Sequence, residues 1–329
     1  MKKLGDKLNA KKLTESAMLS ALLVMMGILF ISSFIGYQVY LDFIVPVLIT
    51  LIYLRCDFKY TLLSAITSVA LITFVFGNPA YSLWMIQNMT IGFFCGFLIK
   101  KDKCLMDDLF YCSLFATLIL VFADIFLSGI IGYSFMAEAQ EALEYVEAYP
   151  IVKDVVFYLI LAALPLGTVV MTYLSGLFIG KKLRLLNENA LRKFLYIKKY
   201  KRYGSMQYCS EKTIIIGLVY VLFMIVIGKN NFLFNSTYFK TVLITMNYII
   251  LYFIIKDYYS MIANFIYKCT SKAIFVMAFQ LTAIYSLFKY FTITACILIM
   301  GGAVIDFKLK VRNNTDRYLR SLDLIKELS

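Results

Sequence analysis

The stretch that decides the fold class is residues 107–133, DDLFYCSLFATLILVFADIFLSGIIGY. After the two acidic residues at its start it holds a single charged side chain, Asp124, in a run otherwise rich in Leu, Ile, Phe and Ala. A membrane-spanning helix needs about 20 mostly apolar residues, with a range of about 17–25. The stretch is therefore predicted to be a transmembrane helix.

The composition of the whole chain indicates the same class. Of its 329 residues 61% are hydrophobic and 16% are charged, whereas soluble domains carry about 45–50% apolar and about 25% charged residues. This excludes a water-soluble enzyme, a disordered chain and a coiled coil. The chain has no histidine, which excludes His-based triads and HExxH metalloproteases. It also lacks GxxxxGK[ST] and GxGxxG nucleotide motifs. We expect no enzyme, no cofactor and no metal site.

Apolar runs recur along the chain and predict an all-α polytopic transmembrane helix bundle of about 8–10 spans, ten being preferred. The predicted spans are 14–36, 39–54, 59–76, 82–99, 107–133, 152–180, 213–228, 238–255, 272–288 and 290–305. The last two could form one kinked span, or a tight hairpin that turns at Lys289 and Tyr290.

Charge distribution favours the hairpin. With ten spans and a cytoplasmic N-terminus, 29 of the 33 Lys and Arg residues fall in cytoplasmic segments, as the positive-inside rule requires. Nine spans would place most cations of the tail outside. We therefore expect a multi-pass protein of a bacterial plasma membrane with both termini cytoplasmic. The net charge of +13 follows from this topology and predicts no nucleic-acid partner.

The predicted organisation has four parts: a six-span domain at 1–180, a basic linker at 181–212, a four-span region at 213–306 and a cytoplasmic tail at 307–329. The linker begins with an amphipathic helix, 181–204, predicted to lie on the membrane surface and contact anionic lipid; binding a partner protein or RNA is the alternative. Its predicted apolar face comprises Leu183, Leu186, Ala190, Leu191, Phe194 and Leu195.

A second soluble stretch, 137–148, carries Glu138, Glu141, Glu144 and Glu147 at intervals of three. This pattern predicts a short outer helix with a solvated acidic face. A lid over an outer site, or a weak cation trap, is the functional alternative.

Asp124 is the candidate functional residue, because a carboxylate deep in a span is costly and by default marks a ligand or ion site. A structural role, with neighbouring hydroxyls or amides holding the carboxylate, is the alternative. The predicted topology brings four further polar or aromatic side chains to the same outer depth: Asp42, Trp84, Gln87 and Asn88. Trp84 also suits an interfacial aromatic belt. Small-ligand sites combine apolar walls with a few placed polar groups, so these five residues are the predicted ligand contacts.

Small residues four apart favour close helix packing, either within the bundle or against a partner subunit. The chain has three such pairs at predicted cytoplasmic ends: Ala17 with Ala21, Gly92 with Gly96, and Gly176 with Gly180.

Two stretches resemble known families. The N-terminal KKLTESAMLSALLVMMG, with Ala17 and Ala21 as an AxxxA motif, resembles the first helix of the S components of energy-coupling-factor transporters. FQLTAIYSLFKY and GGAVIDFKLKVR, which include Gln280, Gly301 and Asp306, resemble the YybS-type family of bacterial integral membrane proteins. That family would cover essentially the whole chain, and its first six spans are distantly similar to S components.

The S-component resemblance implies a fold that binds a micronutrient from outside. It also implies that the AxxxA helix docks on a membrane T subunit and that ABC ATPases supply the energy. The leading hypothesis is thus a binding or uptake subunit for an unidentified small ligand. The alternative is a non-transporting membrane scaffold or sensor that recruits cytoplasmic partners or anionic lipid.

Overall fold

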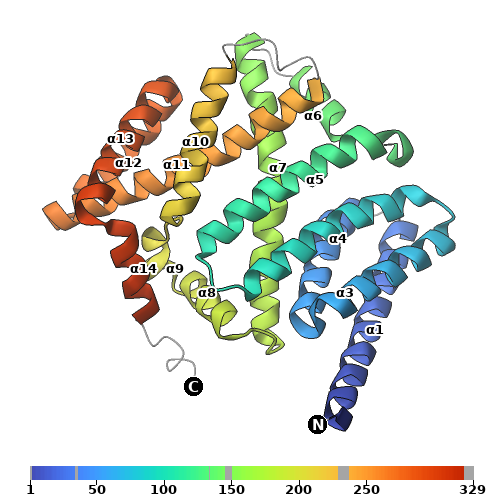
Figure 1. Cartoon of the computed structure of the whole chain (residues 1–329). Helices are drawn as coiled ribbons and strands as arrows, with labels where there is room; N and C mark the ends of the chain where they lie inside the picture. The colour runs from blue at the N-terminus through green and yellow to red at the C-terminus, as the bar shows by residue number, and fades with distance from the viewer. Residues whose placement is uncertain (1, 34–35, 133, 145–149, 229–236, 322–329) are drawn as a thin grey trace. The chain divides into compact units, whose positions relative to one another are not determined.

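The computed structural model describes residues 2–33, 36–132, 134–144, 150–228 and 237–321 (Figure 1). These residues are helical apart from short connections, with no strand among them. Contacts divide the chain into two compact units, each described by itself below. Unit 1 comprises 1–103, 111–191 and 236–246, and unit 2 comprises 104–110, 192–235 and 247–329.

Unit 1 is built from the helices of the first half of the chain. They are α1 (Lys2–Ser33), α2 (Tyr37–Val39), a π-helical turn η1 (Tyr40–Ile44), α3 (Val45–Phe76), α4 (Pro79–Lys100), α5 (Leu105–Ile131), α6 (Phe135–Glu144) and α7 (Pro150–Lys182). The first residues of α5 belong to unit 2.

The remaining helices lie mostly in unit 2. They are α8 (Glu188–Lys198), α9 (Tyr200–Tyr203), a 3-10 turn η2 (Gly204–Met206), α10 (Glu211–Gly228), α11 (Thr237–Thr270), α12 (Ala273–Lys289), α13 (Phe291–Leu309) and α14 (Val311–Ser321). The first turns of α8 and α11 belong to unit 1.

Seven helical stretches of the described residues are long and apolar enough to cross a membrane, and α12 is a shorter apolar helix. The stretches are Ala10–Ser33, Tyr37–Phe76, Pro79–Lys100, Leu105–Ile130, Lys153–Lys182, Tyr238–Thr270 and Phe291–Leu309. The protein is thus an all-α, multi-pass membrane protein, as its composition predicted.

The forty-residue stretch Tyr37–Phe76 contains two helices, because the backbone of Asp57 is not helical (φ 67°, ψ 176°). Tyr40 and Ile72 lie on either side of this break, and a straight helix would separate them by about 48 Å. Both nevertheless meet Gly27 of α1: a Cβ there would lie 2.8 Å from Ile72 Cδ1 and 2.9 Å from Tyr40 Oη. The chain therefore reverses at Asp57, where the sequence predicts a turn between two spans.

The second predicted hairpin is also present. α12 ends at Lys289 and α13 begins at Phe291, with Tyr290 (φ −136°, ψ 57°) between them. The Thr294 hydroxyl donates to the carbonyl oxygen of Ser286 at 3.1 Å, which ties the first turn of α13 to the last turn of α12. Residues 272–305 thus form two antiparallel helices rather than one kinked span.

Small polar residues join α1 to the second half of α3. The Ser20 and Ser68 hydroxyl oxygens are 2.8 Å apart, and the Ser64 hydroxyl donates to the Ser16 carbonyl oxygen at 3.0 Å. In an apolar surrounding such bonds and the small side chains let two helices approach closely. Leu23 and Ile31 complete this buried face of α1.

Glycines allow a similarly close approach of helices where α4 and α7 meet α3. A Cβ on Gly92 would lie 2.4 Å from the carbonyl oxygen of Pro46, and one on Gly96 would lie 2.9 Å from Tyr53. On α7, a Cβ on Gly176 would lie 2.8 Å from Thr50. Gly180 is equally close to Leu186. Both glycine pairs therefore pack inside unit 1.

The basic linker differs from the single surface helix predicted for 181–204. α7 ends at Lys182, Arg184 takes a left-handed conformation (φ 56°), and a new helix, α8, begins at Glu188. Of the predicted apolar face, Ala190, Phe194 and Leu195 are buried. The protein itself covers these side chains, so the prediction that they contact lipid is wrong.

Candidate functional site

Asp42 lies on the π-helical turn Tyr40–Ile44, and a proline explains this turn. Pro46 follows four residues later and has no backbone N–H to donate to the Asp42 carbonyl, so the helix cannot keep regular hydrogen bonds there. π-helical turns of this kind widen a helix locally and are frequent at functional sites.

The Asp42 side chain is held by α4. Its Oδ1 accepts a hydrogen bond from Trp84 Nε1 at 2.7 Å and another from Asn88 Nδ2 at 3.0 Å. Trp84 and Asn88 are one helical turn apart and share a face of α4. Asn88 is buried, and its hydrogen bond fixes the orientation of the Asp42 carboxylate. Three of the five predicted ligand contacts therefore form one hydrogen-bonded group.

Aromatic rings cover this group on one side. The Tyr37 ring packs edge-on against Trp84 and Tyr81, with centroid distances of 6.2 and 6.4 Å. Such edge-to-face pairs are favourable beyond the area they bury. They restrict the orientation of the Trp84 indole, whose N–H is directed at Asp42.

Asp124 is held by a hydroxyl and a backbone amide, the kind of partners expected under the structural alternative. Its Oδ1 accepts the backbone N–H of Phe135, the first residue of α6, at 2.7 Å, and its Oδ2 accepts the Ser134 hydroxyl at 3.2 Å. A carboxylate at a helix N-terminus is stabilised by unpaired N–H groups and the helix dipole. Asp124 thus caps α6, and this capping offsets part of the cost of its burial.

The sequence contains one local indication of this cap, the serine that precedes α6. Ser134 is itself the residue before α6, and its hydroxyl accepts the Ala137 N–H at 3.2 Å, which is the usual role of an N-cap serine. Sequence patterns predict such local caps. They give no hint that a residue ten positions earlier supplies a second acceptor.

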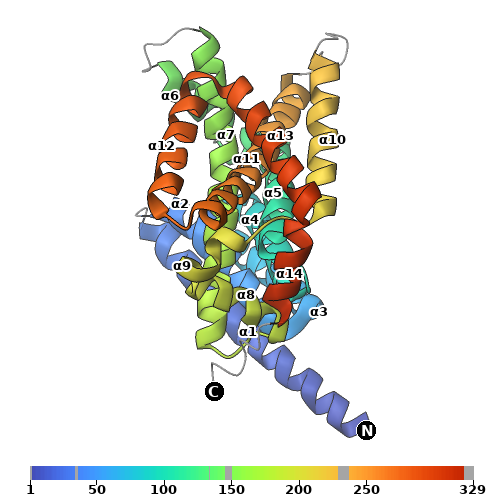
Figure 2. The same cartoon turned by 90° about the vertical axis from the view of Figure 1, so that its left-hand side faces the viewer.

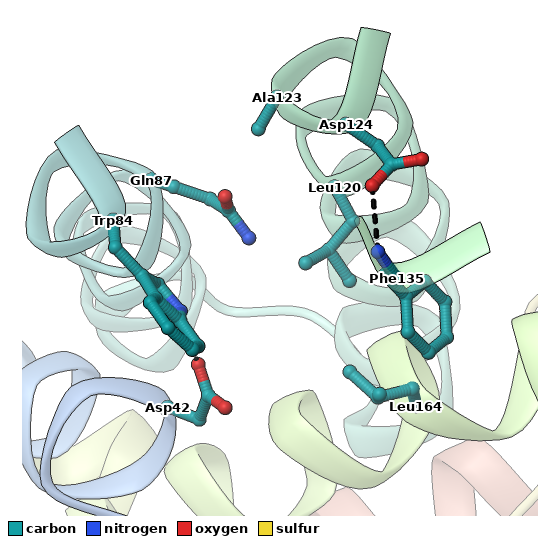
Figure 3. A pocket seen from close by; sticks show the side chains of 8 residues that line it. All are labelled: Asp42, Trp84, Gln87, Leu120, Ala123, Asp124, Phe135 and Leu164. Carbon is teal, nitrogen blue, oxygen red and sulfur yellow. Dashed lines mark hydrogen bonds between the residues drawn. The ribbon is translucent and has the colours of Figure 1, made fainter. Parts of the chain in front are cut away.

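Asp42, Gln87 and Asp124 line one small cavity of unit 1, about 40 Å³ in volume, which we call the acidic cavity (Figure 3). Its other walls come from Trp84, Leu120, Ala123, Phe135 and Leu164. Asp42 and Asp124 lie on opposite sides of the cavity, and the Gln87 amide points into the space between them. Four of the five predicted ligand contacts therefore line this cavity. The fifth, Asn88, holds the Asp42 carboxylate in place.

A wider cavity of about 670 Å³, also in unit 1, shares Asp124 with the acidic cavity. It is lined by Ser128, Ser134, Met136, Ala137, Gln140, Leu143, Glu144, Lys153, Asp154, Phe157, Tyr158, Tyr238 and Thr241. α6 forms one wall, with Leu143 buried beneath it and Glu138, Glu141 and Glu144 exposed. The short acidic helix predicted at 137–148 is thus present for Phe135–Glu144. Glu147 lies outside the described residues.

Ala17 and Ala21 lie to one side of the face of α1 that carries its packed serines. Both are exposed, together with Met18, Leu22 and Met25. The AxxxA face makes no tight packing inside the described chain, unlike the two glycine pairs. A partner helix that docks there stays a prediction.

Unit 2 contains a buried ionic network that the sequence analysis did not anticipate. Arg312 Nη1 donates to Asp257 Oδ2 at 2.8 Å and to the Cys209 carbonyl oxygen at 2.7 Å, and Arg312 Nε donates to Asp306 Oδ2 at 2.8 Å. The Cys209 N–H donates to the same Asp257 oxygen at 2.7 Å. The network ties α14, α13 and α11 to the segment before α10.

The charge state of Arg312 follows from its partners. Burial alone would lower the pKa of its guanidinium, but the carboxylates of Asp257 and Asp306 outweigh that effect and raise the pKa overall. Arg312 therefore stays charged, and its role is to neutralise two carboxylates. A second buried pair, Lys193 Nζ with Asp108 Oδ2 at 2.6 Å, lies in the same unit. These pairs have a structural explanation, because each buried cation neutralises a buried carboxylate.

Metal-ligand groups do not assemble in the described part of the chain: no three Cys, Asp or Glu side chains gather closely enough to hold an ion. The acidic cavity, which four of the five predicted contacts line, is therefore the candidate site for a small ligand.

Comparison with known proteins gives no relative: no protein-family model, no curated protein and no solved structure matches the chain.

Proposed function

We propose that this protein is a membrane-embedded binding or uptake subunit for a small solute, similar to an energy-coupling-factor S component and energised by a partner. The acidic cavity is the observation that carries the proposal. Two carboxylates, an amide and a tryptophan converge on it from separate elements, η1, α4 and α5. Ligand sites have this composition of apolar walls and a few placed polar groups.

The wider cavity supports the same function. It adjoins the acidic cavity at Asp124 and provides aromatic walls through Phe157, Tyr158 and Tyr238. A solute with a polar head and an apolar body would occupy both. α6 forms a wall of this region and would act as a lid, since the N–H of its first residue, Phe135, donates to Asp124 of the site itself.

The exposed AxxxA face of α1 supports the partner in the proposal. Ala17 and Ala21 would contact a T-type membrane subunit, which would couple the bundle to ABC ATPases in a bacterial plasma membrane. The scaffold alternative has less support, because much of the apolar face it would use at 181–204 is buried in the structure.

Affinity purification in mild detergent from the native membrane tests the proposal, with mass spectrometry of both proteins and small molecules. We expect a T-type subunit, ATPases and a bound solute. Replacing Ala17 and Ala21 by Leu should remove the partners and keep the solute. Ala70→Leu, at another exposed alanine, is the matched control. Recovery of cytoplasmic proteins alone, with neither solute nor ATPase, would contradict the proposal.

A further inference from the structure

The acidic cavity carries negative charge on two sides and no positive charge. Neither Lys nor Arg is among its lining residues. Within the described chain, Asp42 accepts hydrogen bonds from Trp84 and Asn88, and Asp124 accepts them from Ser134 and Phe135. All four donors are uncharged. The protein therefore fixes the orientation of both carboxylates, but no cationic side chain of the described residues pairs with either of them.

Two carboxylates facing one cavity without a cationic side chain are electrostatically unfavourable. Two like charges repel more strongly at low dielectric than in water, and a carboxylate inside a membrane protein pairs with a cation or lines a polar path. Two buried carboxylates of unit 2 show the contrast, because Asp257 and Asp108 each have a cationic partner at 2.8 Å or less. A cation that enters the acidic cavity would supply the missing partner.

The free hydrogen-bonding groups indicate the kind of cation. The hydrogen bonds that Asp42 accepts from Trp84 and Asn88 both use Oδ1, and its other oxygen points away from Trp84 (Figure 3). Gln87 makes no hydrogen bond with the described residues, and its amide points into the cavity. Carboxylates on two sides of a water-sized space suit an ammonium head, whose N–H groups donate in several directions.

The wider cavity indicates what is attached to that head. It shares Asp124 as a lining residue with the acidic cavity, and it combines the rings of Phe157, Tyr158 and Tyr238 with the carboxylates of Glu144 and Asp154 and one cation, Lys153. Acidic groups attract cations toward a site, and the rings provide contact for an apolar body.

We infer that the ligand is a small organic cation, with a protonated primary amine bound between Asp42, Gln87 and Asp124 and an apolar or aromatic body in the wider cavity. This inference rests on the proposed solute-binding function and specifies its substrate class.

The sole tryptophan of the chain makes a direct test possible. Trp84 lines the acidic cavity and donates to Asp42, so its fluorescence, excited where tyrosines do not absorb, reports occupancy. Purified full-length protein in lipid nanodiscs would be titrated with methylammonium and 2-phenylethylammonium. The uncharged analogues methanol and 2-phenylethanol, the anion 3-phenylpropanoate and sodium chloride are the matched probes.

We expect a saturable change with both ammonium probes, tighter for 2-phenylethylammonium, and none with the uncharged or anionic probes. Asp42→Asn and Asp124→Asn should each weaken 2-phenylethylammonium binding by about tenfold or more, because each removes a charged acceptor. Glu141→Gln removes a carboxylate of α6 that lines neither cavity and should bind like the original. Thermal unfolding of each variant checks that it is folded.

Three results would overturn the inference. Equal responses to 2-phenylethylammonium and 2-phenylethanol would show a solute site that does not select charge, and the proposed function would stand. An equal response to sodium chloride would assign the cavity to an inorganic cation. Absence of any response, with no solute co-purifying, would remove the proposed function as well.

Discussion

At the scale of single residues, the thiol of Cys209 illustrates how position controls chemistry. Burial, followed by the charges of Asp257 and Asp107, raises its pKa well above the ordinary value, and only 1% of the residue is exposed. Maleimides react with the thiolate. The raised pKa keeps Cys209 protonated at neutral and mildly alkaline pH, so we expect no labelling in the folded protein. Exposed Cys269 should be labelled, and Cys209 only after denaturation. Equal labelling of both cysteines in the folded protein, read by peptide mass spectrometry, would contradict this.

Arg312 is the residue whose loss should destabilise unit 2 most. It is 6% exposed and bonds Asp257, Asp306 and the Cys209 carbonyl. Removing one partner of a buried ion pair leaves an uncompensated charge, at a cost of about 3–5 kcal/mol. Arg312→Met should therefore lower the unfolding temperature in detergent strongly. Adding Asp257→Asn should recover part of the loss, because it removes the orphaned charge. A double variant less stable than the single one would show that the charge is not the cause.

At the scale of elements, the close approach of α4 to α3 depends on Gly92. A Cβ there would lie 2.4 Å from the Pro46 carbonyl oxygen, a backbone atom that no rotamer change can move. Gly92→Ala should lower stability by about 1–3 kcal/mol through overpacking. Gly129→Ala on α5 is the matched control, since its Cβ would meet nothing within 4 Å. Helix propensity should make that variant neutral or slightly more stable. Equal melting temperatures for the two variants would refute the packing argument.

The helices were predictable from sequence, because a span is a local property of about 20 residues. Each predicted span overlaps a helix of the structure, and the turns at Asp57 and Tyr290 fall where charges interrupt the apolar runs. Asp42, Trp84 and Asn88 could be grouped because the predicted topology places them at one depth. The capping of α6 by Asp124 and the pairing of Asp257 with Arg312 join residues that no local pattern connects, so neither was foreseen.

At the scale of the whole molecule, the remaining prediction is the orientation in the membrane. The ten predicted spans place 29 of 33 cationic side chains on the cytoplasmic side, and the hairpin at Tyr290 returns the C-terminus to that side. A fluorescent-protein fusion after Ser329 should therefore fluoresce, because it folds in the cytoplasm. An alkaline phosphatase fusion at Tyr290 should be active, because that enzyme needs the oxidising exterior. The same phosphatase joined after Lys272 should be inactive and controls for expression. An inactive fusion at Tyr290 beside an active one after Lys272 would contradict the predicted orientation of the hairpin.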